Sequence, residues 1–428
     1  MVSSSLMDAG SEKEHDHKKL GKELDLFAFS DLVGSGLPLW TPKGTIVRQE
    51  LDQFVWSLRS KYDYQRVTIP HITKRSLYET SGHWQKFAED LFKVASRDER
   101  EYAIKPMNCP HHTQIFARRP HSYREMPQRY AETTMVYRDE QSGELNGLTR
   151  VLSITQDDSH VFCRTMQIKE EFLKIWDIID TFYKQFKFTD LKVRLSFHDP
   201  KTLEKYLGTP EIWKNAENAL REIAKERGAD SFEAPGEAAL YGPKLDFLAT
   251  DSIGRQHQVA TIQLDLNLPE RFDLTCVNEK GERERIVMIH SAIMGSIERF
   301  TAVLLEHLTG ILPFWLSPVQ VRVLPIAERH KEFAKDIFEK IKAADIRVEI
   351  DTGNETLGKK IRGGKGKKIP YLVVIGDQEM QPEQGLAIEG RDGSKSSYSA
   401  SEFIKRMQEK IHTRSNDLNL NPEPNIVR

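Results

Sequence analysis

One break in the pattern of apolar residues divides this chain into two parts of different fold class. Apolar residues recur with helical spacing from 293 to 308, and Gly310, Pro313 and Pro318 then end the helix. Beyond the break, β-rich runs at 319–326, 346–350 and 369–375 alternate with helical patterns at 329–343 and 402–411. Strands that alternate with helices over this length predict a small α/β domain.

The part before the break is larger and has a different texture. Amphipathic helical patterns lie at 50–58 and 168–186, and the second carries an aromatic stripe that is typical of a core face. Alternating strand-like runs lie at 67–69, 133–137, 191–197 and 256–264, without regular crossover helices between them. We therefore predict an α+β domain, in which helices pack on an antiparallel sheet. The expected boundaries are a flexible leader at 1–19, this domain at 20–312, the α/β domain at 319–415 and a frayed tail at 416–428.

Composition excludes several classes of protein. No apolar run approaches the length of a membrane span, and 29% of the 428 residues are charged, so we expect no membrane association. Three scattered cysteines argue for a reducing compartment. The sequence has no complete G-x-x-x-x-G-K-[ST] loop, which disfavours a P-loop enzyme. The net charge of −2 gives no hint of nucleic-acid binding, although a near-neutral total can hide a local basic face.

Three polar stretches are too unusual to be plain scaffold. In the first, the strand-like run 134–140 (TMVYRDE) places Arg138 and Glu140 before a polar loop that leads to Arg150. This pattern suits a polyphosphate and a base edge, and a hairpin with a surface ion pair explains the spacing equally well. The second is 295–300 (GSIERF), where Arg299 needs Glu298, a distant acid or a ligand phosphate as its partner. The third is 155–160 (TQDDSH), which is too polar for core without a ligand.

Together these stretches resemble the signature motifs of class II aminoacyl-tRNA synthetases. Residues 134–150 resemble motif 2, residues 295–299 resemble motif 3, and Val67–Pro70 (VTIP) resembles motif 1 with its proline at a dimer interface. Five further stretches match the threonyl-tRNA synthetase family in order: 104–112 (IKPMNCPHH), 155–160 (TQDDSH), 240–244 (LYGPK), 261–265 (TIQLD) and 287–290 (VMIH). The resemblance covers about 16–414 and implies the class II catalytic fold followed by an anticodon-binding domain.

The resemblance implies one catalytic Zn²⁺ per subunit, held by Cys109, His160 and His290. Their separations of 51 and 130 residues match no local zinc motif, and singly each is more often a core or surface group. Three protein ligands nevertheless leave positions open for substrate. In this family those positions take the amino group and hydroxyl of threonine.

Further roles transfer by match of motif. The resemblance makes Arg138, Arg299 and Lys244 catalytic, with Arg138 on the α-phosphate of ATP and Arg299 on the γ-phosphate. ATP-binding residues would also include Glu140, Arg150 and Gln263, and Mg²⁺ would accompany the phosphates. Threonine would contact Met107, Gln156, Asp158, Tyr241 and Gln263.

The implied activity is ATP-dependent formation of threonyl-adenylate, followed by transfer of threonine to the 3′ end of tRNA(Thr) by a homodimer. Relatives often carry an N-terminal editing domain, for which no room remains before the catalytic motifs, so we expect measurable seryl-tRNA. Two alternatives stay open: a synthetase-like tRNA-binding protein without catalysis, and a related class II synthetase such as the prolyl enzyme.

A basic segment in the C-terminal domain is a candidate surface for binding tRNA. Six positive residues flank an expected turn at Gly363–Gly364: Lys359, Lys360, Arg362, Lys365, Lys367 and Lys368. Such a set is either a solvated face or a phosphate-binding surface, and the resemblance favours the second. Anticodon or tRNA contacts implied by match are Asn354, Lys359, Lys360, Arg362 and Glu379, whereas Glu389 stands where the family has an arginine.

Several positions depart from the family pattern. Ile154 replaces the phenylalanine under the adenine, Leu152 replaces an arginine, and His111 replaces the glycine beside Cys109. The motif 2 loop also differs at Gln141 and Asn146. We expect His111 to be structural or to face tRNA. These departures favour an organellar enzyme of the mitochondrial matrix, with the cytoplasm as the alternative.

Overall fold

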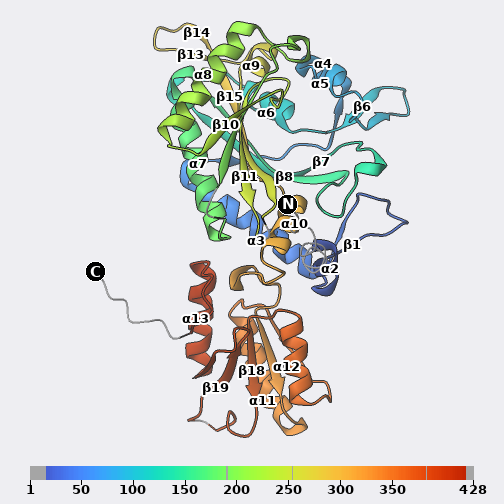
Figure 1. Ribbon diagram of the computed structural model, residues 1–428, viewed down its shortest axis with the longest axis vertical. Coiled ribbons are helices and arrows are strands. Elements are labelled where there is room, and N and C mark those ends of the chain that lie inside the picture. The colour runs from blue at the N-terminus through green and yellow to red at the C-terminus, as the bar shows by residue number, and fades with distance from the viewer. Residues whose placement is uncertain (1–15, 189–190, 253, 382, 421–428) are drawn as a thin grey trace, which may run out of the picture. The chain divides into compact units, whose positions relative to one another are not determined.

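The computed structural model describes residues 16–188, 191–252, 254–381 and 383–420 in two compact units (Figure 1). One unit, here called the catalytic unit, comprises Phe29–Pro38 and Asp52–His307. The other, here called the C-terminal unit, contains the chain from Leu308 onward, Leu39–Leu51 and the described residues up to Ala28. The break after 308 was expected, but residues 20–28 and 39–51 were assigned to the first domain. The structure groups them with the C-terminal unit, where Glu50 pairs with Arg347 at 2.5 Å.

An eight-stranded sheet forms the centre of the catalytic unit. Its strands, in spatial order, are β10 (Ser231–Pro235), β9 (Lys192–Phe197), β11 (Lys244–Thr250), β12 (Gln256–Asp265), β15 (Val287–Ser296), β8 (Ser153–Cys163), β7 (Gln128–Tyr137) and β3 (Gln65–Arg66). All neighbours are antiparallel except the two outermost pairs, β10–β9 and β3–β7. The predicted antiparallel-rich sheet is confirmed.

Helices cover this sheet with apolar stripes. The helix α7 (Ile168–Gln185) buries Phe172, Trp176 and Phe182, as the aromatic spacing predicted. Phe54 of α3 (Pro42–Arg59) stacks on Phe182 at 5.2 Å between ring centroids, and Phe300 of α10 (Ile297–His307) lies 5.1 Å from the same ring. Such aromatic contacts add to the free energy of area burial.

Smaller elements complete the catalytic unit. The helices are α4 (Arg75–Ser81), α5 (His83–Lys86), α6 (Cys109–Ala117), α8 (Pro210–Glu226) and α9 (Asn267–Arg271). The remaining strands are β4 (Ile72–Lys74), β5 (Lys93–Ala95) and β6 (Glu101–Ile104) in one sheet, and the hairpin β13 (Thr275–Val277) and β14 (Arg283–Arg285).

The C-terminal unit has the predicted α/β pattern. Its five-stranded sheet has the order β17 (Val348–Ile350), β16 (Val321–Pro325), β18 (Tyr371–Ile375), β19 (Leu386–Gly390) and β20 (Lys395–Tyr398). The first three strands are parallel and the others antiparallel. The helices are α11 (Lys331–Ala343), α12 (Leu357–Gly366) and α13 (Ala400–His412), and the same unit contains α2 (His17–Glu23), β1 (Phe27–Ala28) and β2 (Leu39–Trp40).

Three expectations for local structure are corrected. The expected turn at Gly363–Gly364 lies inside α12, because Gly364 packs so closely under Leu372 that a Cβ would come within 2.6 Å of it. The helix α2 begins at His17, inside the expected leader, of which residues 1–15 lie outside the described residues. The described part of the expected tail, 416–420, packs on the unit: the Tyr371 hydroxyl donates to the Leu418 carbonyl at 2.7 Å. Within the described residues, no helix combines the length and apolarity that crossing a bilayer requires.

A buried carboxylate joins three elements of the catalytic unit. Asp157 of β8 is fully buried and accepts hydrogen bonds from the backbone N–H groups of Ile293 (2.8 Å) and Met294 (3.0 Å) on β15. Arg59, at the end of α3, donates to the Asp157 carbonyl at 2.6 Å and to its carboxylate at 3.3 Å. Because β15 gives these two N–H groups to Asp157, its register with β8 shifts between Ala292 and Ser296.

Replacing Arg59 by methionine is expected to lower the free energy of unfolding by about 3–5 kcal/mol. Burial already raises the pKa of Asp157 to about 6, and without the arginine this carboxylate must either stay charged without its cation or take up a proton. Urea denaturation of the full chain measures this loss. The control is Arg100→Met, which removes an exposed arginine that lies 2.7 Å from Asp98. That change is expected to cost less than about 1 kcal/mol. Equal losses in the two variants would contradict the role given to Asp157.

Candidate functional site

A cleft of about 550 Å³ in the catalytic unit gathers the residues predicted for metal, ATP and threonine. It is lined by all thirteen of them: Met107, Cys109, Arg138, Glu140, Arg150, Gln156, Asp158, His160, Tyr241, Lys244, Gln263, His290 and Arg299. The first and last of these residues, Met107 and Arg299, are 192 positions apart in the chain. The sequence-based site is therefore one continuous surface in the structure.

The polar run 155–160 divides between the two faces of β8. Gln156, Asp158 and His160 line the cleft, as alternate residues of a strand should. The other three residues are buried on the opposite face, where each has protein partners. Thr155 donates to Glu298 from both its N–H (2.8 Å) and its hydroxyl (2.7 Å). The Ser159 hydroxyl lies 2.7 Å from that of Ser291, and Asp157 is held as described above. Only half of this run is therefore available to a ligand.

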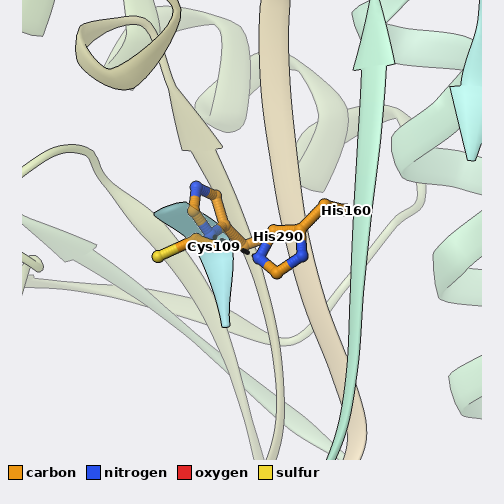
Figure 2. A group of neighbouring side chains, drawn as sticks. All are labelled: Cys109, His160 and His290. Atoms are coloured by element: carbon orange, nitrogen blue, oxygen red, sulfur yellow. Dashed lines mark hydrogen bonds between the residues drawn. The ribbon is translucent and has the colours of Figure 1, made fainter. Parts of the chain in front are cut away.

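Cys109, His160 and His290 form a buried group at one part of the cleft (Figure 2). Cys109 begins α6, while His160 and His290 lie directly opposite each other on β8 and β15. One ligand atom from each of the three lies within 4.8 Å of the others, and His160 Nε2 lies 3.1 Å from His290 Nδ1. Tetrahedral zinc with Zn–N bonds of about 2.0–2.1 Å places two nitrogens about 3.3 Å apart. The donor set and its spacing thus fit a Zn²⁺ ion.

Asp265 orients one of these histidines and was not singled out as a site residue from the sequence. Its Oδ2 lies 2.9 Å from His290 Nε2, which leaves Nδ1 of that ring for a metal. Its Oδ1 accepts the N–H groups of Asn267 (2.8 Å) and Leu268 (3.0 Å) at the start of α9. The signal available in the sequence is an acid placed where a strand turns into a helix.

Burial sets the protonation of the thiol and of a nearby imidazole. Burial raises the pKa of the Cys109 thiol well above its usual value, and the acids Asp158 and Asp265 add to this rise. A bound divalent cation reverses this balance, because it stabilises the thiolate. Burial also lowers the pKa of His83 to about 3, and its Nε2 has no hydrogen-bond partner within the described structure. His83 is therefore a neutral side chain near the cleft that the sequence did not mark.

Two arginines in the cleft are left for anionic ligands. Within the part of the chain that the structure describes, neither Arg138 nor Arg299 forms an ion pair with a carboxylate. The guanidinium group of Arg138 makes one long contact, to the Pro106 carbonyl at 3.5 Å. Burial, and then the charge of Arg150, lowers the pKa of Arg299 from its ordinary value. Of the partners considered for Arg299, Glu298 is excluded because it binds Thr155 instead. A ligand phosphate suits both guanidinium groups.

Other predicted residues have protein partners in the cleft. Arg150 donates to Glu140 at 2.6 Å and also lies 2.9 Å from Glu144, so an ion pair is present in the motif 2 segment. Lys244 lies 3.2 Å from the buried Asp246. On the threonine side, Asn108 donates to Asp158 at 3.0 Å and Gln263 donates to the Gly242 carbonyl at 3.2 Å.

Comparison with known proteins identifies the family. Residues 92–308 match the tRNA synthetase class II core domain (G, H, P, S and T), and residues 320–410 match the anticodon-binding domain. The RNA-binding domain of threonyl-tRNA synthetase from Cryptosporidium parvum is similar in structure, with a TM-score of 0.88 and 38% identity over 92% of this chain and 98% of that one. The chain belongs to the threonyl-tRNA synthetase family.

Curated threonine–tRNA ligases are similar in sequence. The enzyme of Phocaeicola vulgatus is 45% identical over 96% of this chain, and that of Porphyromonas gingivalis is 49% identical over 87%. This chain spans 64% and 57% of the length of these two relatives. A prolyl-tRNA synthetase from Cryptosporidium parvum shares the fold, with a TM-score of 0.68 at 19% identity.

Three of the departures from the threonyl-tRNA synthetase pattern can be located in the structure. Ile154 lines the cleft. Leu152 lies against Gly36, whose carbonyl accepts its N–H at 2.8 Å and whose absent Cβ would lie 2.9 Å from the leucine side chain. His111 is buried, its pKa is lowered to about 4 by burial, and it lies outside the candidate metal group.

The residues expected to read tRNA do not all lie on the surface. Asn354, Lys359 and Arg362 are exposed, and Glu379 accepts the Gly376 N–H at 2.8 Å. Lys360 was predicted to contact tRNA, but it is buried and donates to the carbonyls of Pro325 and Asp351 at 3.0 and 3.1 Å. Its place on the inner face of α12 explains this correction. Glu389, in the position of the family arginine, pairs with Lys365 at 2.5 Å.

Proposed function

We propose that this chain ligates L-threonine to tRNA(Thr) in two steps, ATP-dependent formation of threonyl-adenylate and transfer to the tRNA 3′ end. One observation carries the proposal: a cleft that combines a Cys-His-His group with two arginines that have no carboxylate partner among the residues the structure describes. The first group suits an amino acid with a hydroxyl, and the second suits a polyphosphate. The relatives named threonine–tRNA ligase support the same activity.

In the activation step, Arg138 would bind the α-phosphate of ATP and Arg299 the γ-phosphate, with Mg²⁺ accompanying the phosphates. Glu140 would accept from the adenine edge, supported by Arg150, and Lys244 and Gln263 would hold the adenylate. The protein contributes mainly positioning and stabilisation of charge as the threonine carboxylate attacks. The carboxylate oxygen forms a bond to the α-phosphorus, and pyrophosphate leaves.

Threonine selection would depend on Cys109, His160 and His290 as ligands of one Zn²⁺ ion per subunit. When bound, zinc supplies a Lewis acid with open positions for the amino group and hydroxyl of threonine. Asp158 would accept from the amino group, while Met107, Gln156 and Tyr241 would enclose the side chain. A site that binds the hydroxyl can reject valine by about 10⁴–10⁵, whereas a missing methyl group gives only about 10–200-fold against serine.

The alternatives are less well supported. A tRNA-binding protein without catalysis has no reason to keep Arg138 and Arg299 in one cleft. A prolyl enzyme has no hydroxyl to recognise with the Cys-His-His group, and the prolyl relative supports similarity of fold alone.

We also propose a homodimer that pairs along the edge of the catalytic sheet. There β3 contributes the exposed residues Gln65 and Arg66, and motif 1 follows directly. Placement in the mitochondrial matrix, with the cytoplasm as the alternative, stays a prediction from the sequence.

Threonine-dependent ATP–pyrophosphate exchange, with zinc measured on the same sample, tests the activity. We expect about one zinc per chain, and we expect Cys109→Ser to lose zinc and most of the exchange because a neutral hydroxyl is a poor replacement for a thiolate ligand. Cys163→Ser is the matched control, since Cys163 is equally buried and lies outside the candidate metal group. Exchange with proline, or without zinc, would overturn the proposal.

Serine is the informative second substrate in the same experiment. Because one methyl group discriminates weakly, this chain assayed by itself should activate serine and form seryl-tRNA. If neither seryl-tRNA nor serine-dependent ATP consumption is detected, the expectation is wrong, and the chain itself excludes or edits serine.

Exposed positive residues on α12 should contribute to tRNA affinity. Lys359→Glu and Arg362→Glu are expected to weaken tRNA binding and to reduce its salt dependence by about one phosphate contact each. Filter binding at several salt concentrations measures both quantities, with the exposed Lys395→Glu on β20 as the control. Identical behaviour of all three variants would argue against a specific surface on α12.

A further inference from the structure

We propose that His112 and Glu132 are positioning residues for His160, and that they determine which nitrogen of the His160 ring carries its proton. The inference rests on the proposed metal site. His112 and Glu132 neither line the cleft nor belong to the candidate metal group. The inference follows from a buried row of polar atoms behind His160.

The first contact in this row joins two imidazoles. His112 lies on α6, three residues after Cys109, and is fully buried. Its Nδ1 lies 2.7 Å from His160 Nδ1, with the two ring planes perpendicular and the centroids 4.7 Å apart. His160 thus has Nδ1 directed to His112 and Nε2 directed to His290 and the metal position.

The hydrogen bond of His290 to Asp265 limits where the ring protons of His160 and His112 can lie. His290 Nε2 lies 2.9 Å from the Asp265 carboxylate, which only accepts, so His290 carries its proton on Nε2 and presents a lone pair at Nδ1. A metal bound between the rings also needs a lone pair on His160 Nε2. The proton of His160 must then lie on Nδ1 and point to His112. His112 must accept it at Nδ1, and its own proton must lie on Nε2.

Glu132 is placed to stabilise that form of His112. His112 Nε2 and Glu132 Oε2 face each other at 3.9 Å, and within the described structure both atoms are buried without a hydrogen-bond partner. Glu132 Oε1 accepts the Ile69 N–H at 3.2 Å, which fixes the carboxylate on β7 against the motif 1 segment. A proton on His112 Nε2 gives both unpartnered atoms a charge-assisted contact. A proton on Nδ1 would leave the carboxylate facing a lone pair.

The two histidine ligands are therefore oriented in different ways. His290 meets its carboxylate directly, whereas His160 reaches one through a second imidazole. Partners behind metal-bound histidines typically affect metal affinity by 10–100-fold, because they fix the tautomer and the ring direction.

Zinc affinity of the full chain, measured by competition with a chromogenic chelator, tests the proposal without reference to activity. We expect His112→Leu to weaken zinc binding by about 10–100-fold. His112→Asn, which keeps an acceptor near the position of Nδ1, should recover most of the loss. Glu132→Gln should give an intermediate loss. In the Co²⁺-loaded chain, the d–d absorption bands should shift in His112→Leu and return towards the wild-type positions in His112→Asn.

The control is His111→Leu, which removes the neighbouring buried imidazole on the same helix and should leave zinc affinity unchanged. Wild-type affinity in His112→Leu, or an equal loss in His111→Leu, would overturn the positioning role while leaving the metal site intact. A wild-type chain that binds no zinc would overturn both. Because His112→Asn and Glu132→Gln are mild changes, the comparison holds even where His112→Leu does not fold.

Discussion

The buried carboxylate of Asp157 is the interaction on which the catalytic unit depends. An ionised group in the protein interior is tolerated only where charge and hydrogen bonds compensate its lost hydration. Asp157 meets this requirement with Arg59 from α3 and two N–H groups from β15. Those N–H groups leave the strand ladder, so β15 bulges and then turns through Gly295, whose φ of +76° suits a residue without a side chain. One charge thereby fixes a helix, two central strands and the entry to α10.

The turn that Asp157 creates delivers Arg299 to the cleft. The helix α10 begins at Ile297, and its first turn carries Glu298 and Arg299 to opposite environments. Glu298 accepts hydrogen bonds from the N–H and hydroxyl of Thr155. Because Thr155 and Asp157 lie on the same buried face of β8, the two acids hold the same short segment of chain. Arg299 lines the cleft and has no carboxylate partner in the described ranges of the chain. The proposed phosphate-binding position therefore depends on hydrogen bonds on the face of the sheet opposite the cleft.

Much of this arrangement could be predicted from the sequence, and the limits have physical causes. Period-two and helical spacing located the helices α3, α7, α10, α11 and α13 and some of the strands, and ordered motifs located the cleft residues. The helix α12 was missed because glycines at 363 and 364 suggest a turn, whereas here the absence of a side chain at Gly364 lets the helix approach Leu372. Lys360 was taken for a surface cation because burial of a lysine depends on carbonyls that only the fold brings to it. Asp265, His83 and His112 were not singled out, since their importance lies in contacts between distant segments.

In the candidate metal group, strand register brings together residues that are far apart in the sequence. His160 and His290 are 130 residues apart, yet they are paired directly across β8 and β15, so their side chains share one face of the sheet. A slip of one residue between these strands would send one histidine to the opposite face, where Asp157 and Thr155 are buried. The pairing that satisfies Asp157 and the pairing that aligns the two histidines are the same. The contacts that stabilise this pairing of strands therefore also preserve the geometry of the site.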